Sequence, residues 1–387
     1  MQFLSVRLAI AGVSTIVALL SRTAALNIVG FEGKELEPYT NTTLPPGFPE
    51  SAAPIIQGAC YSPFHNAEYP LNGGSNAAGL DAAMDNDFSI MKNYVTVVRT
   101  YYSTFYGYPV TPHAAKHGIS LYLGVYMTDE GWYESQVSAA ITAVRDYPNT
   151  IAAILVGNEN IAPAGPYSAA QVSSRITALR SRILAETGRT VRIGTVQRLT
   201  EWVDTSIQPA MIALANNCDI VGVNIYPFFD ASYTARDPLA MLNGAWNKML
   251  SLYSVEKVRL TEIGFPTAGA PPPFAPNNVP GLISSIAFYN AFLKWVPSSG
   301  GQEVFWFMFF DRRPDDNTME LNLEKYFGFF TYQKLAKASN FPVSVAASTP
   351  APTAVSVPST SPQATAPAAT TRPTTSSPVC RVRKVYK

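Results

Sequence analysis

The sequence is poor in the residues that build disulfide frameworks. Its 387 residues include three cysteines, Cys60, Cys218 and Cys380. An odd count leaves at least one thiol unpaired within the chain, and three cysteines cannot form a disulfide framework. Cys60 and Cys218 fall in or beside strand-like runs, where we interpret them as small buried apolar residues, although a bond between the two stays open. We therefore expect stability to rest mainly on side-chain packing.

Histidine is equally scarce, which bears on metal chemistry. Of the three histidines, His113 and His117 have the i,i+4 spacing of one helix face. No glutamate follows the first of them in the His-Glu-x-x-His order of zinc hydrolases, so we expect a surface helix and no metal site. The chain also lacks a Gly-Lys-Ser/Thr phosphate loop and a Gly-x-Ser-x-Gly nucleophile turn. We therefore expect no cofactor.

Charge is low as well. Asp, Glu, Lys and Arg make up 14% of the chain, and the formal net charge is +1. Such a chain has no electrostatic means of holding nucleic acid or an anionic membrane. Hydrophobic residues reach 47%, which permits a large core and excludes a disordered chain. Most of the 20 Tyr, 20 Phe and 5 Trp should fill that core, but those beside strand ends could stack on the apolar face of a sugar.

Long hydrophobic runs are missing apart from one at the N-terminus. Arg7, the apolar stretch Leu8–Leu20 and the small residues Thr23-Ala-Ala25 have the pattern of a secretory signal, so we assign residues 1–25 to a signal peptide. The apolar stretch is too short to span a membrane comfortably. We expect a secreted protein, extracellular or in the cell wall, with an N-glycosylation sequon at Asn41. We also expect a monomer.

Composition divides the remainder into three parts. Residues 26–53 form a lead-in with no clear periodicity, and residues 54–339 are predicted to form one globular domain. Residues 340–387 are dominated by Ser, Thr, Pro and Ala. Because that composition cannot bury a core, we expect a disordered tail that would suit an extended, O-glycosylated stalk.

Within the globular part, short apolar runs alternate with helical patterns. The better helical patterns are 134–147, 168–187, 239–253 and 282–295, and Ser168 and Gly188 suit the start and stop of the second. Apolar strands alternating with helices indicate a parallel sheet covered by helices, and eight units over this length fit an α/β fold of the (β/α)8 TIM-barrel type. An open doubly wound sheet is the rival, but it usually carries a Gly-rich turn after its first strand, and here Cys60-Tyr-Ser-Pro-Phe64 follows. The eight expected strands are 55–61, 94–101, 119–126, 151–157, 190–197, 219–226, 257–263 and 303–310.

Two glutamates follow strands of this predicted barrel. Glu159 comes after Ile151–Val156, with Asn158 directly before it, and Glu262 comes after Lys257–Thr261. Parallel barrel strands would bring both acids to the same catalytic face. One glutamate alone would be an ordinary surface acid, but a pair in matching context suits a retaining glycosidase. Such an enzyme needs one carboxyl as acid/base and one as nucleophile, about 5–5.5 Å apart.

Other polar and aromatic groups gather at the same strand ends. Asn158 could hydrogen-bond a sugar 2-OH, an interaction that strengthens in the transition state. Arg99 or Tyr226 could keep the nucleophile ionised, although taken singly a barrel-end salt bridge or a partly buried ring is the simpler interpretation. The residues at the predicted strand ends are Tyr61, Arg99, Tyr101, Asn158, Glu159, Asn224, Tyr226, Glu262, Phe309 and Asp311.

In order along the chain, these segments resemble the motifs of glycoside hydrolase family 17, the glucan 1,3-β-glucosidases and related glucanosyltransferases. The motifs are Gln57-Gly-Ala-Cys-Tyr-Ser-Pro63, Val98-Arg-Thr-Tyr101, Val156-Gly-Asn-Glu159, Asp219 to Asn224-Ile-Tyr-Pro-Phe-Phe229, Glu262-Ile-Gly-Phe-Pro-Thr267 and Glu324-Lys-Tyr-Phe-Gly-Phe-Phe330. The resemblance implies a (β/α)8 barrel, hydrolysis with retention, Glu159 as acid/base, Glu262 as nucleophile and β-1,3-glucan as substrate. It also implies substrate contacts by the motif residues, including Tyr61, Tyr101, Tyr226, Phe265 and Glu324.

The chain departs from the family pattern in two places. Phe265 stands where the nucleophile motif usually has Trp, so stacking there should be weaker or differently shaped. After the eighth strand the plant enzymes usually carry Asn-Glu-x-x-Lys, and here Asp311 stands in for the Glu, with Arg312 or Arg313 for the Lys. Both changes leave the catalytic carboxyls intact and concern glucan length and the balance of hydrolysis against transfer. We therefore keep three hypotheses: a β-1,3-glucan hydrolase, a cell-wall glucanosyltransferase, and a glucan-binding wall protein without turnover.

Overall fold

The computed structural model describes residues 56–72, 74–295 and 297–344. The predicted signal peptide (1–25), the lead-in (26–53), the sequon at Asn41, residues 345–387 of the predicted tail and Cys380 lie outside the described residues. The packed chain runs past the expected domain end at residue 339, because Phe341 is 1% exposed and packs against Phe329 with ring centroids 4.9 Å apart.

Within the described residues, eight parallel strands form one sheet that closes on itself. The sheet begins with β10 beside β1 and ends with β9. Backbone hydrogen bonds from Ile263 N to Phe305 O (3.1 Å) and from Phe307 N to Ile263 O (2.7 Å) join β9 to β10 and close the barrel. Each strand overlaps one of the eight expected segments, so the predicted (β/α)8 barrel is confirmed. The strands are β1 (Ile56–Tyr61), β2 (Val97–Thr100), β5 (Ser120–Val125), β6 (Ile151–Asn158), β7 (Ile193–Arg198), β8 (Ile220–Asn224), β9 (Val258–Glu262) and β10 (Glu303–Trp306).

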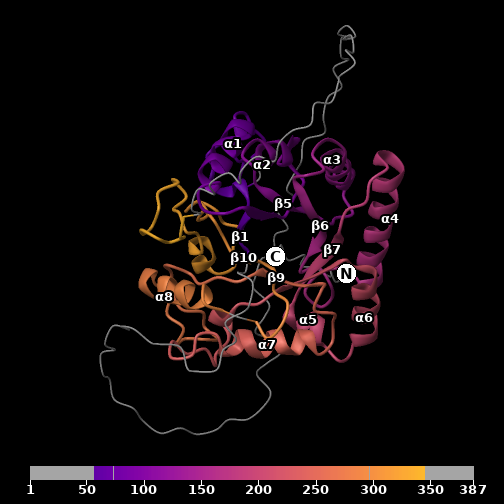
Figure 1. Cartoon of the computed structure of the whole chain (residues 1–387). Coiled ribbons are helices and arrows are strands. Elements are labelled where there is room, and N and C mark those ends of the chain that lie inside the picture. Colours follow the sequence, from indigo (N-terminus) through magenta and orange to yellow (C-terminus); the bar gives the residue numbers. More distant parts are fainter. Residues whose placement is uncertain (1–55, 73, 296, 345–387) are drawn as a thin grey trace, which may run out of the picture.

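Helices surround this barrel (Figure 1). The four expected helices are present as α3, α4, α7 and α8, and α4 begins with a capping box between Ser168 and Gln171 and ends at Gly188 with φ 66°. The expected helix around His113 and His117 is α2, and the two imidazoles contact Asp81 and Asp85 of α1 at 3.0 and 2.9 Å. The described helices are α1 (Leu80–Met91), α2 (Thr111–Lys116), α3 (Tyr133–Asp146), α4 (Ala169–Thr187), α5 (Leu199–Val203), α6 (Gln208–Asn217), α7 (Ala240–Leu250) and α8 (Leu282–Phe292). Shorter elements complete the fold: the hairpin β3 (Thr104–Phe105) and β4 (Tyr108–Pro109), and the 3-10 turns η1 (Pro63–His65), η2 (Pro227–Phe229) and η3 (Asn322–Tyr326).

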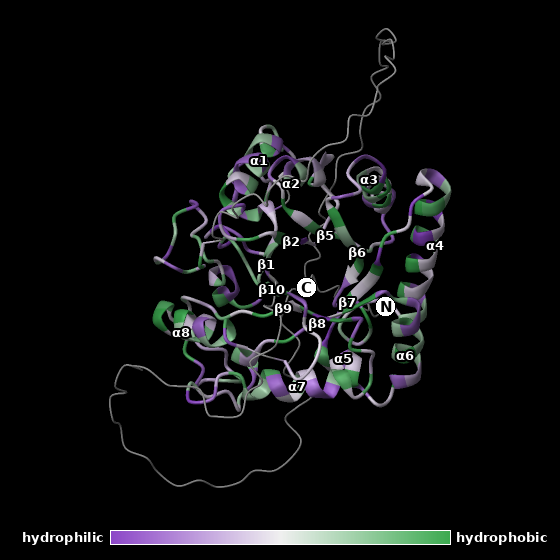
Figure 2. Cartoon of the chain, in the orientation of Figure 1, coloured by the Kyte–Doolittle hydropathy of each residue, from purple (hydrophilic) through white to green (hydrophobic). Residues whose placement is uncertain are grey.

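The core consists of the barrel strands and the inner faces of the helices. On α4, Val172, Ile176, Leu179 and Ile183 recur on one face and are buried, as expected for an amphipathic helix. Figure 2 shows the same alternation of hydrophobic and hydrophilic residues around α4 and α6. The strands are buried on both faces because helices cover one and the barrel interior covers the other.

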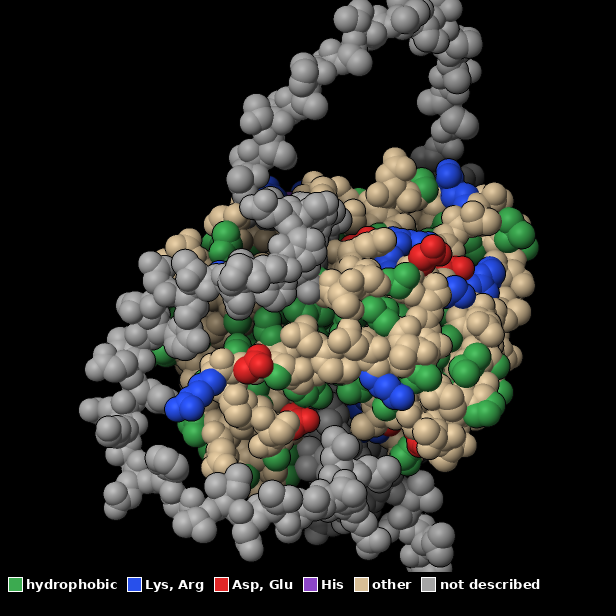
Figure 3. Space-filling view, turned by 60° about the horizontal axis from the view of Figure 1, so that its bottom comes forward, with side chains coloured by type: hydrophobic (Ala, Val, Ile, Leu, Met, Phe, Trp, Pro, Cys, Tyr) green, Lys and Arg blue, Asp and Glu red, His purple; other side chains and the backbone are tan. Residues whose placement is uncertain are grey.

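Cys60 and Cys218 are buried and not bonded to each other, which confirms their interpretation as small core residues. Burial raises the pKa of both thiols to about 12. The face seen in Figure 3 carries scattered charged side chains of both signs, in keeping with the low net charge. None of the described helices is both long and apolar enough to cross a bilayer.

Candidate active site

Glu159 and Glu262 lie at the carboxyl end of the barrel. Glu262 is the last residue of β9, and Glu159 directly follows β6. Both strands belong to the same parallel sheet, so their carboxyl ends open on one face. Each side chain is almost enclosed, since both residues are 2% exposed. The structure thus brings the two sequence-predicted acids to one end of the barrel.

Three donors surround the carboxylate of Glu262. Arg99, on β2, forms a buried ion pair with Oε1 and also donates to the Thr261 carbonyl at 3.0 Å. The hydroxyl of Tyr101 donates to Oε1 at 2.9 Å, and that of Tyr226 donates to Oε2 at 2.5 Å. A guanidinium and two hydroxyls stabilise the charged form of a carboxyl and fix its orientation. This is the environment that an anionic nucleophile requires.

Two asparagines connect this ion pair to Glu159. Arg99 Nη2 donates to Asn158 Oδ1 at 2.6 Å. The amide of Asn224 donates to the same oxygen at 3.3 Å and to Glu159 Oε1 at 2.7 Å. Thr261 fixes that amide by donating to Asn224 Oδ1 at 2.9 Å. One hydrogen-bonded network therefore runs from β9 to β6 and orients both carboxyls.

The backbone at Glu159 has an uncommon conformation. Glu159 has φ 47°, in the left-handed region that few residues other than glycine adopt. Gly157, two residues earlier, has φ 75°, and a Cβ there would meet the Asn160 amide nitrogen at 2.4 Å. Gln197 holds this turn, because its carbonyl accepts from the backbone N–H of Asn160 at 3.0 Å and its amide donates to Asn160 Oδ1 at 2.9 Å. Strained backbone held by such contacts is often found where a side chain must be aimed at a site.

The electrostatics of the two carboxyls differ. Burial raises the pKa of Glu159 to about 7, with a further contribution from the negative charge of Glu262, while the Asn224 hydrogen bond acts in the opposite direction. At neutral pH a substantial share of Glu159 is therefore protonated, beside a Glu262 that is paired with a guanidinium. A buried carboxyl whose pKa is raised in this way can serve as a general acid.

Four other residues predicted to bind substrate lie apart from this network. No hydrogen bond found among the described residues joins any of them to either glutamate. Tyr61 donates to the buried carboxylate of Asp87 at 2.8 Å. Phe265 is 2% exposed and packs in an aromatic cluster, 4.8 Å from Phe228 between ring centroids. Glu324 is buried in η3, where it accepts from the Leu321 N–H at 3.3 Å.

Asp311, the fourth, has a cation partner that the sequence reasoning missed. Its carboxylate is 2.7 Å from Nζ of Lys337 and accepts from the Gly328 N–H at 2.8 Å. Arg312 and Arg313, which the sequence comparison set in the place of the plant enzymes' Lys, pair with Asp316 and Asp315. Burial raises the pKa of Asp311 to about 6 despite the neighbouring ammonium group. The lysine paired with Asp311 comes from the segment after η3.

The sequence reasoning also gave no role to several residues that support the site. Asn224 stood at a predicted strand end and Gln197 at the end of another, so their positions were foreseeable even though their partners were not. Arg198 and Glu201 form a buried ion pair at the end of β7, with nitrogen–oxygen distances of 2.9 and 2.5 Å. Their charges act on Glu159 in opposite directions. In the sequence, only their i,i+3 spacing could have indicated this ion pair.

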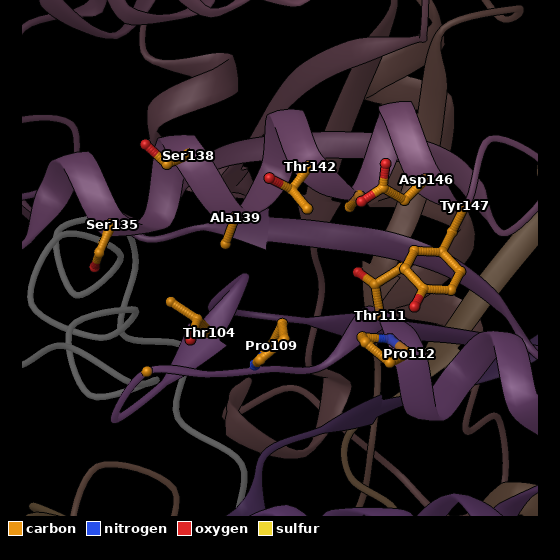
Figure 4. A pocket seen from close by; sticks show the side chains of 12 residues that line it. Thr104, Pro109, Thr111, Pro112, Ser135, Ser138, Ala139, Thr142, Asp146 and Tyr147 are labelled. Atoms are coloured by element: carbon orange, nitrogen blue, oxygen red, sulfur yellow. The ribbon is translucent and has the colours of Figure 1, made fainter. Parts of the chain in front are cut away.

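Hollows elsewhere on the surface do not include the glutamates. One hollow lies between the β3–β4 hairpin and α3 and measures about 460 Å³ (Figure 4). A second, of about 570 Å³, is lined by residues near the start of β6 and β7. Among the described residues, no cluster of His, Cys, Asp and Glu has the make-up of a metal site. The first hollow is lined by Thr104, Gly107, Pro109, Thr111, Pro112, Ser135, Ser138, Ala139, Thr142, Ala143, Asp146 and Tyr147.

A closed (β/α)8 barrel with two buried carboxyls at the carboxyl ends of its fourth and seventh strands is the arrangement of a barrel-type glycoside hydrolase. Comparison with protein families agrees with this class. The model of the BtgE/BtgC glycoside hydrolase domain matches residues 58–328, and the chain belongs to that family.

Similar sequences are found in Aspergillus species. A probable β-glucosidase BtgE of Aspergillus flavus is 26% identical over 274 residues, covering 70% of this chain and 41% of the relative. A BtgE of Aspergillus fumigatus is 24% identical over 267 residues, covering 67% of this chain and 44% of the relative. The chain thus spans about two fifths of the length of these relatives.

Solved structures share the fold at low identity. An active-site mutant of a Rhizomucor miehei β-1,3-glucanosyltransferase in complex with laminaritriose aligns with a TM-score of 0.56 and 16% identity, covering 73% of this chain and 95% of that one. CJP38, a β-1,3-glucanase and allergen of Cryptomeria japonica pollen, aligns with a TM-score of 0.54 and 19% identity, covering 73% and 97%. At these identities the likeness establishes the barrel fold.

Proposed function

We propose that this protein is a secreted retaining glycoside hydrolase that cleaves β-1,3-glucan through a glycosyl-enzyme intermediate. The observation that carries the proposal is the contrast between its two carboxyls. Glu262 is ion-paired with Arg99 and accepts two tyrosine hydroxyls, whereas burial raises the pKa of Glu159 to about 7. One is prepared as an anion and the other as a proton donor, which is the division of labour in retaining hydrolysis.

The first step would break the glycosidic bond. Glu262 would attack the anomeric carbon while Glu159 donates its proton to the glycosidic oxygen, so the leaving sugar departs as an alcohol. The product of this step is an ester between Glu262 and the sugar, and Glu159 is left as a carboxylate. Arg99, Tyr101 and Tyr226 would hold the attacking carboxylate in place.

The second step would release the sugar. Glu159, now ionised, would take a proton from water, whose oxygen attacks the anomeric carbon and frees Glu262. Two inversions give net retention. Asn158, held by Arg99 at 2.6 Å, would contact the 2-OH of the sugar, an interaction that gains strength as positive charge develops at the anomeric carbon.

The choice of β-1,3-glucan rests on the family 17 motifs and on the proteins that share the fold. The β-1,3-glucanase and β-1,3-glucanosyltransferase structures support that linkage, and the BtgE relatives support a β-linked glucose substrate. Secretion rests on the N-terminal pattern of Arg7 and Leu8–Leu20. Cleavage of that segment from the protein recovered in a culture medium would test it.

A glucanosyltransferase is the second candidate, since the Rhizomucor miehei structure shares the barrel. In that reaction a second sugar hydroxyl replaces water in the second step. A glucan-binding protein without turnover is the third hypothesis, and the two opposed carboxyls argue against it, because binding alone does not require them.

The testing experiment follows products of a linear β-1,3-glucan hexasaccharide by length over time, with Glu262→Gln as the inactive control. Only shorter products, with the β-anomer released first in NMR spectra, support retaining hydrolysis. Products longer than the substrate favour transfer. Folded protein that leaves the hexasaccharide unchanged, or releases the α-anomer first, overturns the proposal.

A further inference from the structure

Three aromatic side chains lie with nearly parallel faces near the candidate active site, and we call them the ring platform (Tyr102, Tyr126 and Trp132). The planes of Tyr102 and Tyr126 differ by 2°, with centroids 4.7 Å apart. Trp132 is tilted by 25° from Tyr126 and 27° from Tyr102, at 5.5 and 6.3 Å. A single column would separate the outer rings by the sum of the two shorter distances. The three centroids instead form a triangle, so the rings are offset from one another and do not form one column.

The ring platform lies at the same end of the barrel as the two glutamates. Tyr102 directly follows Tyr101, whose hydroxyl donates to Glu262. The Cα atoms of Tyr101 and Tyr102 are therefore about 3.8 Å apart. Tyr126 directly follows β5, the neighbour of β2 in the sheet, and Trp132 precedes α3. The platform therefore lies at the carboxyl ends of two adjacent strands, on the face of the barrel that carries both acids.

The platform packs against a buried ring and remains partly exposed. Phe105, which is 3% exposed, packs against Tyr102 with centroids 5.1 Å apart. The three platform rings are each intermediate in exposure. Rings that only filled the core would be covered as Phe105 is, so this arrangement leaves aromatic surface available to a ligand.

Charged contacts hold the loop that carries Trp132. Arg175 of α4 donates to Asp129 at 2.8 Å and lies over the ring of Tyr133, 4.4 Å from its centroid. The Trp132 indole N–H donates to Glu130 at 3.0 Å. These contacts fix the indole before any ligand arrives, which lowers the entropy cost of binding.

We propose that the ring platform binds sugar units of the β-glucan chain beyond those at the scissile bond; the inference rests on the proposed function and adds its preference for long substrates. The pyranose ring of glucose has an apolar face that stacks on aromatic rings. Three offset rings offer room for more than one glucose unit. Carboxylates at Asp129 and Glu130 can accept hydroxyl hydrogen bonds and disfavour an anionic ligand.

The test compares Trp132→Ala with wild type on a β-1,3-glucan trisaccharide and hexasaccharide. Stacking on one ring is worth roughly tenfold in binding, so kcat/KM on the hexasaccharide should fall by about tenfold and on the trisaccharide by less than about twofold. Trp132→Phe, which keeps a ring, should recover most of the loss. Trp132 makes no side-chain capping hydrogen bond to α3, so replacement should leave the helix intact.

The matched control is Tyr147→Ala. Tyr147 follows the other end of α3, is also intermediate in exposure and lines the separate hollow in Figure 4. It should leave both substrates unaffected. If Trp132→Ala fails to fold, Tyr126→Leu serves as the second variant with the same expected dependence on chain length.

Binding to Glu262→Gln separates the two proposals. Titration of this variant with hexasaccharide should show about tenfold weaker binding when Trp132→Ala is added. If wild type cleaves both oligosaccharides and the platform variants change both equally or not at all, the platform is wrong and the hydrolase stands. If nothing is cleaved but binding still depends on Trp132, the platform stands and the hydrolase is wrong. Hexasaccharide binding that is independent of Trp132 overturns the platform.

Discussion

The hydroxyl of Tyr226 lies 2.5 Å from Oε2 of Glu262, the oxygen that Arg99 leaves free. Tyr226 follows β8 and Glu262 ends β9, so neighbouring strands deliver the two groups to each other. Because Arg99 and Tyr101 bind the other oxygen, both oxygens of the carboxylate are held by hydrogen-bond donors. This fixed orientation is a geometric requirement of a nucleophile that must approach one carbon atom.

Tyr226→Phe should therefore slow the reaction while leaving the fold intact. A hydrogen bond to a charged group contributes about 1.5–3 kcal/mol, so kcat/KM on β-1,3-glucan oligosaccharides should fall by roughly 10- to 100-fold. Tyr253→Phe is the control, because its hydroxyl is also 2.5 Å from an acceptor, the Trp202 carbonyl, away from both glutamates. Equal kinetic losses in the two variants would mean that Tyr226 acts only through general stability.

The pH dependence should report Glu159. Its pKa is raised to about 7, mainly by burial and then by Glu262, and in the proposed mechanism its proton expels the leaving sugar. Activity on glucan should thus be retained below pH 7 on this limb and fall about tenfold per pH unit above it. In Glu159→Ala, an aryl β-glucoside with an acidic phenol leaving group should show no such limb.

Azide provides a further test of the two roles. In Glu159→Ala it should attack the glycosyl-enzyme and give a β-glycosyl azide, because the covalent step on Glu262 is preserved. In Glu262→Ala azide should instead replace the missing nucleophile and give the α-glycosyl azide. The same anomer from both variants would contradict the assignment. The configuration can be read directly by NMR.

Lys337 should be important for stability through Asp311. The pair is 2.7 Å long and nearly enclosed, with side chains 9% and 8% exposed. Lys337→Met leaves a buried carboxylate unpaired and should cost about 3–5 kcal/mol in the free energy of unfolding. Adding Asp311→Asn should recover much of this loss.

Urea denaturation checks the Lys337 prediction against a surface pair of the same length. Lys116 and Asp85 are also 2.7 Å apart, but Lys116 is 63% exposed. Lys116→Met should change stability by about 0–1 kcal/mol. If Lys337→Met lowers the free energy of unfolding by no more than this control does, water must reach the buried pair.

Phe341 should belong to the cooperative folding unit of the barrel. Its ring packs against Phe329 at 4.9 Å and Tyr289 at 5.5 Å, and the residue is 1% exposed. Phe341→Ala in the full chain should cost about 3–5 kcal/mol. Leu335→Ala, at 62% exposure, should cost about 0.5 kcal/mol or less. Equal thermal unfolding of the two variants would place Phe341 outside the cooperative unit.

The barrel and the two acids could be predicted because their signals are local. Each strand is a short apolar run, and each glutamate immediately follows one. Helix α1 was not predicted, because a charged residue, Asp87, interrupts its buried face between Met84 and Phe88. That burial is possible only because His65, Asn66, Tyr61 and Lys334 supply partners from other segments.

Long-range partners explain the remaining differences. Lys337 meets Asp311 only after the chain has turned through η3, and no spacing rule connects the two. Phe265 looked like a stacking residue from its motif, but its side chain fills a space formed by Phe228 and Phe288. Sequence patterns located the strand ends, whereas the direction and partner of each side chain depended on the assembled barrel.

Closure of the barrel has a consequence for synthesis of the chain on the ribosome. Gly58 of β1 pairs in register with Phe305 of β10, so the edge of the first strand stays without its partner until roughly 250 further residues have emerged. At about 5–20 residues per second this interval lasts roughly 12 to 50 seconds. During that time an apolar parallel edge is open to pairing with another nascent chain. Slow elongation would lengthen this exposure, and a chaperone that shields Ile56–Ala59, the residues that pair with β10, would be most valuable before the last strand is made.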